Sequence, residues 1–283
     1  VQDLKTGENL AASAYTADLT AGTVTFTEVP ALGVNSLEIG WTMATNFRTQ
    51  VSSMRYSELY DGAQDTRVFL YGDGSNQAIY SGLDYDGKPR ADYFPDLNVV
   101  NVGDENTPIT GLIRHYSTLI AFKTSSAWSI RTSELTLSDG SITKAFYVSP
   151  INRAIGNAAL GQPRLVLNSP RTLHGKDAFE WKNNSSYSSN LTADERQAKR
   201  ISDRMYATLG GFDLTKCYCW DDNDNQEYYI CCGGKALVQN YAADAWYCYD
   251  SFDAVCMANF HGSLYYGTSN GAIEHFGFEH ITD

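Results

Sequence analysis

Short apolar runs separated by turn residues make up most of this chain. Arg67–Tyr71 and Gln77–Ser81 alternate or cluster apolar residues on either side of Gly72–Asn76, a segment rich in glycine, aspartate and asparagine. Asn98–Val102 is a third run of the same kind. Runs of this length bounded by such turn residues are typical of β-strands, and patterns with a helical period are scarce. The pattern therefore predicts a chain built mainly of short strands.

The unit of strands and turns recurs along the chain. Residues 112–130 align with residues 257–276 when Leu119 is placed on Leu264, and weaker copies occur in Leu165–Trp181 and Glu227–Tyr241. Repetition of a unit of three or four strands is typical of radial β architectures. We predict an all-β fold, a β-propeller of about five blades. The expected blades cover residues 66–108, 109–160, 163–185, 212–250 and 255–278.

The N-terminal part differs from the repeated part. Gly22–Phe26 and Leu37–Trp41 alternate apolar and polar positions around a loop that contains proline and glycine. Two such segments predict a hairpin with one buried face. We therefore expect a small β-domain or insert in residues 1–62 and the β-propeller in residues 63–283. A strand that closes the propeller is expected from residues 1–20.

One helix is predicted within the strands. Thr192–Glu195 has the sequence of a capping box, and Gly210 and Gly211 would end the helix. The apolar residues at three- and four-residue steps are Ala198, Ile201, Met205 and Leu209. A second stripe at four-residue steps consists of Arg196, Arg200 and Arg204. These arginines suit docking against acidic groups of a neighbouring subunit, and pairing with acids of the same chain is the alternative.

The net charge of the chain limits the classes of partner that it is expected to bind. Lys and Arg number 21 against 33 Asp and Glu, a formal net charge of −12 with a pI near 4.8. A sequence-independent nucleic-acid binder needs a basic surface, so that class is disfavoured. An acidic wall would instead let DNA slide past without binding. The chain contains no apolar run long enough to span a membrane, so no membrane partner is expected.

Residues with metal-binding or catalytic chemistry form no recognised motif. The six cysteines lack zinc-site pairs, so buried packing is expected, with disulfides and a metal site as alternatives. Asp221–Asn225 resembles the start of a calcium loop but lacks the later glycine and glutamate, so a polar hairpin turn is predicted and calcium stays open. The five histidines are scattered, at His115, His174, His261, His275 and His280. We predict no metal, no cofactor and no enzymatic activity, although a two-carboxylate glycosidase centre is not excluded by spacing.

Tryptophans recur at similar places in the repeated units. Trp128, Trp181, Trp220 and Trp246 all fall in predicted strands. Packing between blades is the expected role, because large aromatic side chains dominate buried cores. A surface that stacks on carbohydrate is the alternative.

Several segments, in this order, resemble a known group of proteins. They read TRVFLYGDGSNQAIYSG, YFPDLNVVNVG, ITGLIRHYSTLIAFKTSSAWSI, ERQAKRISDRM and DDNDNQEYYICCGGKALVQNYAADAWYCY. The chain resembles the β-propeller structural proteins of tailed bacteriophages, including the packaged-DNA stabilisation or tail-hub propellers. The hairpin GTVTFTEVPALGVNSLEIGWT resembles a small β-domain inserted in phage structural proteins.

The resemblance implies a structural role. Such hubs lie between head and tail in rings and help to retain the packaged genome. The chain is therefore expected in the virion, assembled in the host cytoplasm, at the head–tail connector or tail hub. Its expected partners are copies of itself in a ring, other head–tail proteins, and DNA that passes through the lumen without specific binding. The alternative is a propeller at the tail that binds a receptor or glycan.

Overall fold

The chain divides into two compact units. The computed structural model describes residues 1–18, 20–28, 36–40, 47–61, 65–84, 86–136, 142–183 and 196–276. The units are Val1–Arg48 and Thr49–Asp283, and helix α1 (Phe47–Ser53) spans their boundary. We expected the division after residue 62. It lies earlier because β5 (Tyr56–Tyr60) pairs with β6 (Arg67–Tyr71), so that segment belongs to the larger unit.

The N-terminal unit contains two small antiparallel pairs. Its elements are β1 (Gln2–Asp3), η1 (Ala12–Ala14), β2 (Tyr15–Asp18), β3 (Thr23–Phe26) and β4 (Leu37–Glu38). The predicted hairpin between Gly22–Phe26 and Leu37–Trp41 is wrong, since β3 pairs with β2 and β4 pairs with β1. A local turn favours the pairing of β2 with β3. In this turn the Asp18 carboxylate accepts hydrogen bonds from the amides of Thr20 and Ala21, each at 2.9 Å. Such a turn brings adjacent strands together before a distant strand can compete.

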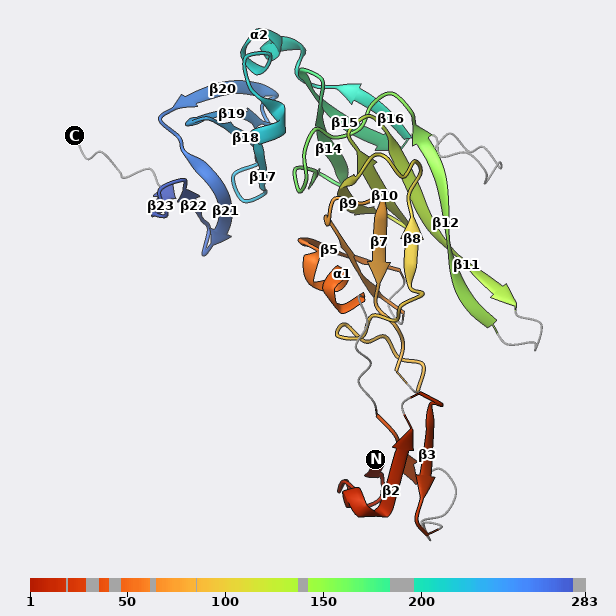
Figure 1. Ribbon diagram of the computed structural model, residues 1–283. Coiled ribbons are helices and arrows are strands. Elements are labelled where there is room, and N and C mark those ends of the chain that lie inside the picture. The colour runs from red at the N-terminus through yellow and green to blue at the C-terminus, as the bar shows by residue number, and fades with distance from the viewer. Residues whose placement is uncertain are drawn as a thin grey trace. The chain divides into compact units, whose positions relative to one another are not determined.

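The larger unit consists of five antiparallel sheets in chain order (Figure 1). The first sheet is β5 (Tyr56–Tyr60), β6 (Arg67–Tyr71), β7 (Gln77–Tyr80) and β8 (Val99–Asn101). The second is β9 (Ile109–His115), β10 (Thr118–Lys123), β11 (Ala127–Thr136) and β12 (Ile142–Asn152). The third is β13 (Arg164–Val166), β14 (Ser169–His174), β15 (Asp177–Asn183) and β16 (Arg196–Arg200). The fourth is β17 (Tyr218–Asp222), β18 (Glu227–Cys232), β19 (Lys235–Asn240) and β20 (Ala245–Asp250). The fifth has three strands, β21 (Ala254–Phe260), β22 (Ser263–Thr268) and β23 (Ile273–Phe276).

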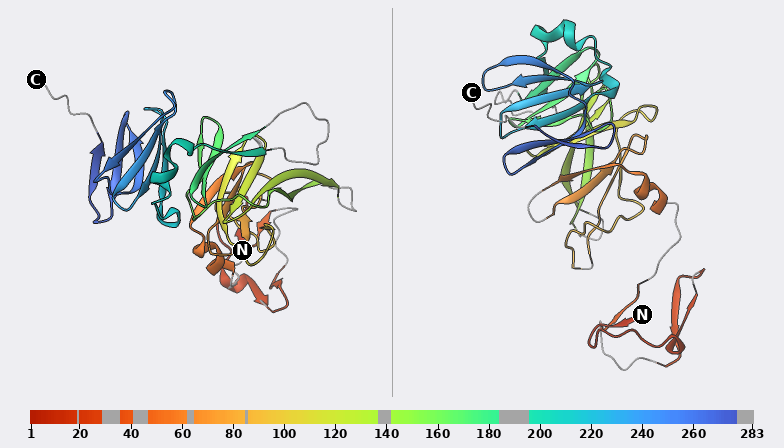
Figure 2. Two further views of the ribbon diagram at one scale, coloured as in Figure 1. Left: turned by 90° about the horizontal axis from the view of Figure 1, so that it is seen from above. Right: turned by 90° about the vertical axis from the view of Figure 1, so that its left-hand side faces the viewer.

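Successive sheets pack against one another as propeller blades do. Apolar cores join the first sheet to the second, the second to the third, the third to the fourth and the fourth to the fifth. The first strands of the sheets are also neighbours, in the order β5, β9, β13, β17 and β21. The colours of Figure 2 show the sheets of the larger unit following one another in chain order. The fold is therefore all-β and of the propeller type, as predicted. Within the described residues, no core cluster joins the fifth sheet to the first.

The predicted repeat corresponds to equivalent strands. Leu119 and Leu264 are each the second residue of the second strand of a sheet, in β10 and β22. The turns before these strands also match, because Tyr116 and His261 both adopt a positive φ, 56° and 50°. The burial differs, however. All six residues of β10 are buried, whereas buried and partly exposed residues alternate in β22. Among the described residues, an internal sheet is covered on both faces and the fifth sheet on one.

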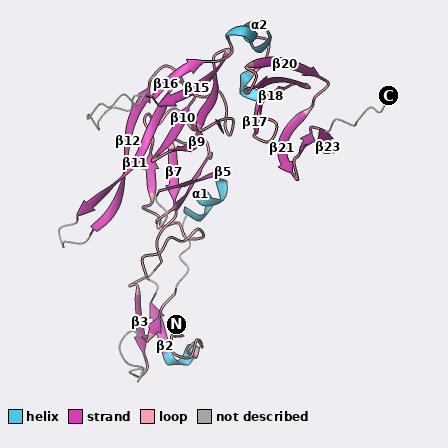
Figure 3. Cartoon of the chain, turned by 180° about the vertical axis from the view of Figure 1, so that it is seen from behind, coloured by secondary structure: helices cyan, strands magenta, loops and turns pink. Residues whose placement is uncertain are grey.

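The predicted helix is wrong over most of its length. Residues 196–200 form β16, which pairs with β15 and places Ala198 opposite Trp181. Within the described part of the predicted helix, helical structure is limited to η2 (Asp203–Met205) and one turn of α2 (Tyr206–Leu209), and η3 (Leu214–Lys216) follows it. The predicted capping box, Thr192–Glu195, lies outside the described residues. Strands dominate the rest of the larger unit (Figure 3). None of the described helices has the length and apolar character of a membrane span.

The strand expected to close the propeller pairs elsewhere. We predicted it within residues 1–20, but β1 and β2 pair with β4 and β3 inside the N-terminal unit. The fifth sheet keeps three described strands, and β23 forms its edge.

The tryptophans pack between sheets as predicted. Trp181 is fully buried in the core between the second and third sheets. Trp128, Trp246 and Trp220 pack against the other three cores.

Candidate functional site

The three arginines predicted to dock on a partner do not share a helix face. Arg196 and Arg200 lie on strand β16, and Arg204 lies in the turn η2. For Arg196 only the backbone is described. Arg200 forms ion pairs with Asp177, at 3.8 Å, and with Asp203. Arg200 therefore pairs with acidic residues of its own chain, and docking of the three arginines on a neighbouring subunit stays a prediction.

Arg204 likewise has partners in its own chain. Its guanidinium lies 3.4 Å from the Asp244 carboxylate and donates to the Asp244 carbonyl at 2.9 Å. Both side chains are 70% exposed. Exposed pairs of this kind exchange readily with solvent, so Arg204 remains accessible to another acidic group.

A hairpin turn joins β17 to β18 as predicted, but Asp221 and Asp222 end strand β17 and the turn itself is formed by residues 223–226. Asp222 is buried and accepts hydrogen bonds from the amide side chains of Asn225, at 2.8 Å, and Asn259, at 2.5 Å. Asn259 lies on β21 and also accepts from the indole of Trp220 at 2.8 Å. The turn therefore joins the fourth sheet to the fifth through side-chain hydrogen bonds.

The remaining candidate metal ligands are dispersed. Across the described ranges, no group of three or more His, Cys, Asp or Glu side chains is arranged to hold a metal ion. All six cysteines are free: Cys217, Cys219 and Cys231 are buried as expected, Cys232 is half-buried, and Cys248 and Cys256 are exposed. His280 lies outside the described residues.

A polar seam lies between the third and fourth sheets, and the sequence did not reveal it. We define it as Arg171, Glu180, Asp221, Tyr228, Gln239 and Tyr241. Arg171 and Glu180 are cross-strand neighbours in the third sheet. In the fourth sheet Asp221 is opposite Tyr228, and Tyr228 is opposite Gln239. Register thus gathers residues from different strands into one facing pair of rows.

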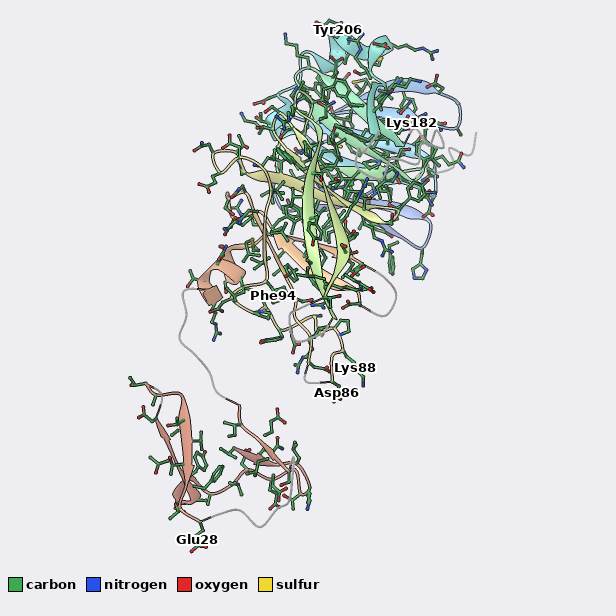
Figure 4. All side chains as sticks on the ribbon, turned by 90° about the vertical axis from the view of Figure 1, so that its right-hand side faces the viewer. Glu28, Asp86, Lys88, Phe94, Lys182 and Tyr206 are labelled. Carbon is green, nitrogen blue, oxygen red and sulfur yellow. The ribbon has the colours of Figure 1, made fainter. Side chains whose placement is uncertain are left out.

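Arg171 is at the centre of this polar seam. It is 3% exposed and donates to the Gln239 side-chain oxygen at 2.8 Å. Its guanidinium carbon lies 5.0 Å from the centre of the Tyr228 ring and 5.7 Å from that of Tyr241. Glu180 is 3.7 Å away and also pairs with Lys182, labelled in Figure 4, at 3.0 Å. A buried guanidinium is stable only with such compensation.

Asp221 is a titratable group of the polar seam whose pKa is raised into the range accessible to experiment. Burial raises its pKa to about 6, while the nearby Arg171 charge acts in the opposite direction. Burial also raises the pKa of Tyr241 to about 12, assisted by the neighbouring Asp221. The carboxyl therefore binds a proton more tightly in the folded protein than in the unfolded chain.

The Asp221→Asn variant tests this shift through pH-dependent stability. Since the folded pKa, about 6, exceeds the ordinary 3.8, the stabilisation from protonated Asp221 is complete below pH 4 and is lost as the pH rises toward 6. Asparagine does not titrate, so the variant does not lose this stabilisation as the pH rises. We expect its free energy of unfolding, relative to the wild type, to increase between pH 4 and pH 6 in urea titrations. A difference that stays constant across this interval would contradict the raised pKa.

The outer face of the fifth sheet is a second candidate surface. Its cross-strand rows are Cys256, Gly267 and Ile273, then Ala258, Tyr265 and His275, with Phe260 at the end. Phe260 is 61% exposed and Ile273 is 81% exposed. An almost entirely apolar hollow of about 380 Å³ lies on this face. Gly267 helps to form it, because a Cβ there would lie 2.6 Å from the Cys256 sulfur.

Comparison with known proteins finds resemblance in structure alone. No protein-family model matches the chain, and no curated protein does. The extracellular domain of a hybrid two-component system from B. thetaiotaomicron is similar with a TM-score of 0.31 and 11% identity, over 80% of this chain and 39% of that one. The extracellular domain of a one-component system from the same organism has a TM-score of 0.35 and 12% identity, over 80% and 35%. The chain thus spans well under half the length of both domains.

Proposed function

We propose that this chain is a non-catalytic structural subunit of a tailed-bacteriophage particle, located at the head–tail connector or tail hub. Copies of the chain would form a ring with other head–tail proteins and help to retain packaged DNA. Support comes from the phage-like segments of the sequence and from the net charge of −12, which disfavours tight binding of DNA that moves through a lumen.

The observation that carries the proposal is the apolar outer face of the fifth sheet. Internal sheets bury both faces in inter-sheet cores, whereas this face leaves Phe260 and Ile273 exposed at 61% and 81%. Exposed apolar surface that surrounds a hollow is typical of sites of association. A subunit whose task is assembly needs such a surface, and a freely soluble enzyme does not.

The alternative of a glycan-binding tail propeller has less support. Its candidate stacking residues were tryptophans, but Trp181 is buried and Trp128, Trp220 and Trp246 pack against inter-sheet cores. A carbohydrate needs an accessible aromatic face. Binding of the purified chain to a host-polysaccharide array, without self-assembly, would favour this alternative over the connector.

Assembly is tested with the Phe260→Asp/Ile273→Asp double variant. Burying two carboxylates in an apolar contact is unfavourable, so we expect association to weaken by roughly 30-fold or more, the effect of losing one interface hot spot. Mass photometry over a concentration series measures the oligomers. The matched control is Leu97→Asp, because Leu97 is 91% exposed and lies in a loop of the first sheet.

Two results would contradict the proposal. One is a wild-type chain that stays monomeric at every concentration, alone and with phage particle proteins. The other is a double variant that assembles like the wild type and the Leu97→Asp control, which would remove the fifth sheet from the interface.

A further inference from the structure

Two cysteines of the fourth sheet lie opposite each other at one end of a strand pair. Cys217 immediately precedes β17 and has an extended backbone, with φ −72° and ψ 138°, and Cys232 is the last residue of β18. Tyr218 pairs with Cys231, so the next step of the antiparallel register brings Cys217 to Cys232. Residues opposite each other in such a pair have Cα atoms about 4.5–5.5 Å apart. A disulfide spans about 4.4–6.8 Å between Cα atoms, so the backbone can hold this bond.

The two thiols also meet at one backbone oxygen. The Sγ atoms of Cys217 and Cys232 lie 3.4 Å and 3.6 Å from the Asp213 carbonyl oxygen. The Cys217 thiol is also within hydrogen-bonding reach of the Cys232 thiol. Both side chains therefore point to the same place beside the turn that precedes β17.

The other two cysteines of this hairpin contact different groups. The Cys219 thiol lies against the hydroxyl of Tyr228. The Cys231 sulfur lies 4.0 Å from the Met257 sulfur, in the core between the fourth and fifth sheets. The geometry thus distinguishes one pair of thiols from its neighbours.

We propose that Cys217 and Cys232 are a site of reversible oxidation, at which a small organic disulfide converts the two thiols into a cross-strand disulfide. The Cys232 thiolate attacks one sulfur of the reagent, the S–S bond of the reagent breaks, and the first thiolate leaves and takes up a proton. The Cys217 thiol then loses its proton to solvent and attacks the Cys232 sulfur, which releases the second thiol. Two protein thiols are oxidised, and one reagent disulfide is reduced to two thiols.

The exposure of the two thiols sets the order of these steps. Cys232 is half-buried, so a small reagent reaches it, whereas Cys217 is buried. Burial also raises the pKa of the Cys217 thiol. Since the thiolate is the nucleophile, Cys217 reacts slowly with reagents from solution. It reacts with Cys232 because that sulfur is adjacent and carries a leaving group after the first step.

The bond would join the first strand of the fourth sheet to the second. β17 is the strand of this sheet that neighbours β13 of the third sheet and β21 of the fifth. A cross-link that closes a loop restricts the unfolded chain and so stabilises the fold. Oxidation would therefore stabilise the part of the larger unit where three sheets meet. The inference does not depend on the proposed function, because it concerns one hairpin of the isolated chain.

The first test maps the disulfides of the wild-type chain. The reduced protein is treated with 2-hydroxyethyl disulfide, a small neutral reagent, and the remaining thiols are alkylated. Cleavage at the acidic residues within 221–227 separates the two strands, and tandem mass spectrometry assigns the linked sulfurs. We expect a bond between Cys217 and Cys232 that dithiothreitol reverses. A link through Cys219 or Cys231, a mixed disulfide that persists on Cys232, or two alkylated thiols would overturn the proposal.

The second test compares thermal stability before and after the same oxidation. We expect the Tm of the wild type to rise by about 5 °C or more, and that of Cys232→Ser to stay unchanged. The matched control is Cys248→Ser/Cys256→Ser, which removes the two exposed cysteines and should gain as much as the wild type. A gain in Cys232→Ser equal to that of the wild type would overturn the proposal, since other thiols would then be responsible. A fall in the wild-type Tm would also overturn it, because the bond would then strain the hairpin.

Discussion

The Arg171→Met variant is expected to unfold with a free energy about 3–5 kcal/mol below that of the wild type, the range for removing one partner of a buried charge cluster. Methionine keeps much of the side-chain volume but removes the guanidinium. Glu180, whose side chain is 12% exposed, would then keep Lys182 as its cation partner, and Asp221 would lose the nearby Arg171 charge. Gln239 would lose the donor at 2.8 Å. Urea denaturation at pH 7 measures the change.

Lys235→Met is the matched control for this variant. Lys235 forms an ion pair with Asp250 at 3.0 Å, but the two side chains are 56% and 75% exposed. Solvent screens such a pair, so its loss should change stability little. If Arg171→Met were as stable as this control, the polar seam would not be a structural contact between the third and fourth sheets.

Trp181→Ala is expected to cost about 3–5 kcal/mol in the free energy of unfolding, as large-to-small changes of buried tryptophan do. Trp181 is fully buried, and its ring centre lies 5.3 Å from that of Phe122 in the second sheet. Its indole also donates to the Thr172 hydroxyl at 2.9 Å. The substitution thus leaves a cavity between two sheets and an unpaired hydroxyl.

The comparison variant is Trp246→Ala, at a half-buried position against the core of the third and fourth sheets. Because solvent already reaches Trp246, less apolar surface is lost and the decrease in stability should be smaller. Equal losses for the two variants would mean that the degree of burial does not set the cost of removing a tryptophan from these inter-sheet cores.

Much of the blade structure was predictable because its signals are local. Strands β6, β7 and β8 follow apolar runs bounded by glycine, aspartate and asparagine, and each predicted blade corresponds to an antiparallel sheet. The alignment of Leu119 with Leu264 even matched the positive φ of Tyr116 with that of His261. Turn chemistry acts over two to four residues, so it can be read without the fold.

The segment around Arg200 could not be assigned from local signals. Residues three and four apart share a helix face, but residues two and four apart share a strand face, so Arg196 and Arg200 fit both. This segment forms a strand because pairing with β15 places Ala198 against the core that contains Trp181. That core forms only when the second and third sheets are both present.

The polar seam likewise could not be predicted from signals between neighbouring residues of the sequence. Arg171 stands in a segment of mixed polarity, Ser169–His174, and Asp221 was considered only as part of a predicted turn. No sequence spacing relates them, since Arg171 lies on β14 and Asp221 on β17.

The sequence by itself determined the all-β class, the repeated strand units and most of their turns, because alternation and turn chemistry depend on neighbouring residues. The tertiary structure alone decided which strand pairs with β15, which charges meet between sheets, and which apolar face stays open on the fifth sheet. Those outcomes depend on contacts between residues far apart in the chain. Their free energies appear only after the sheets have stacked.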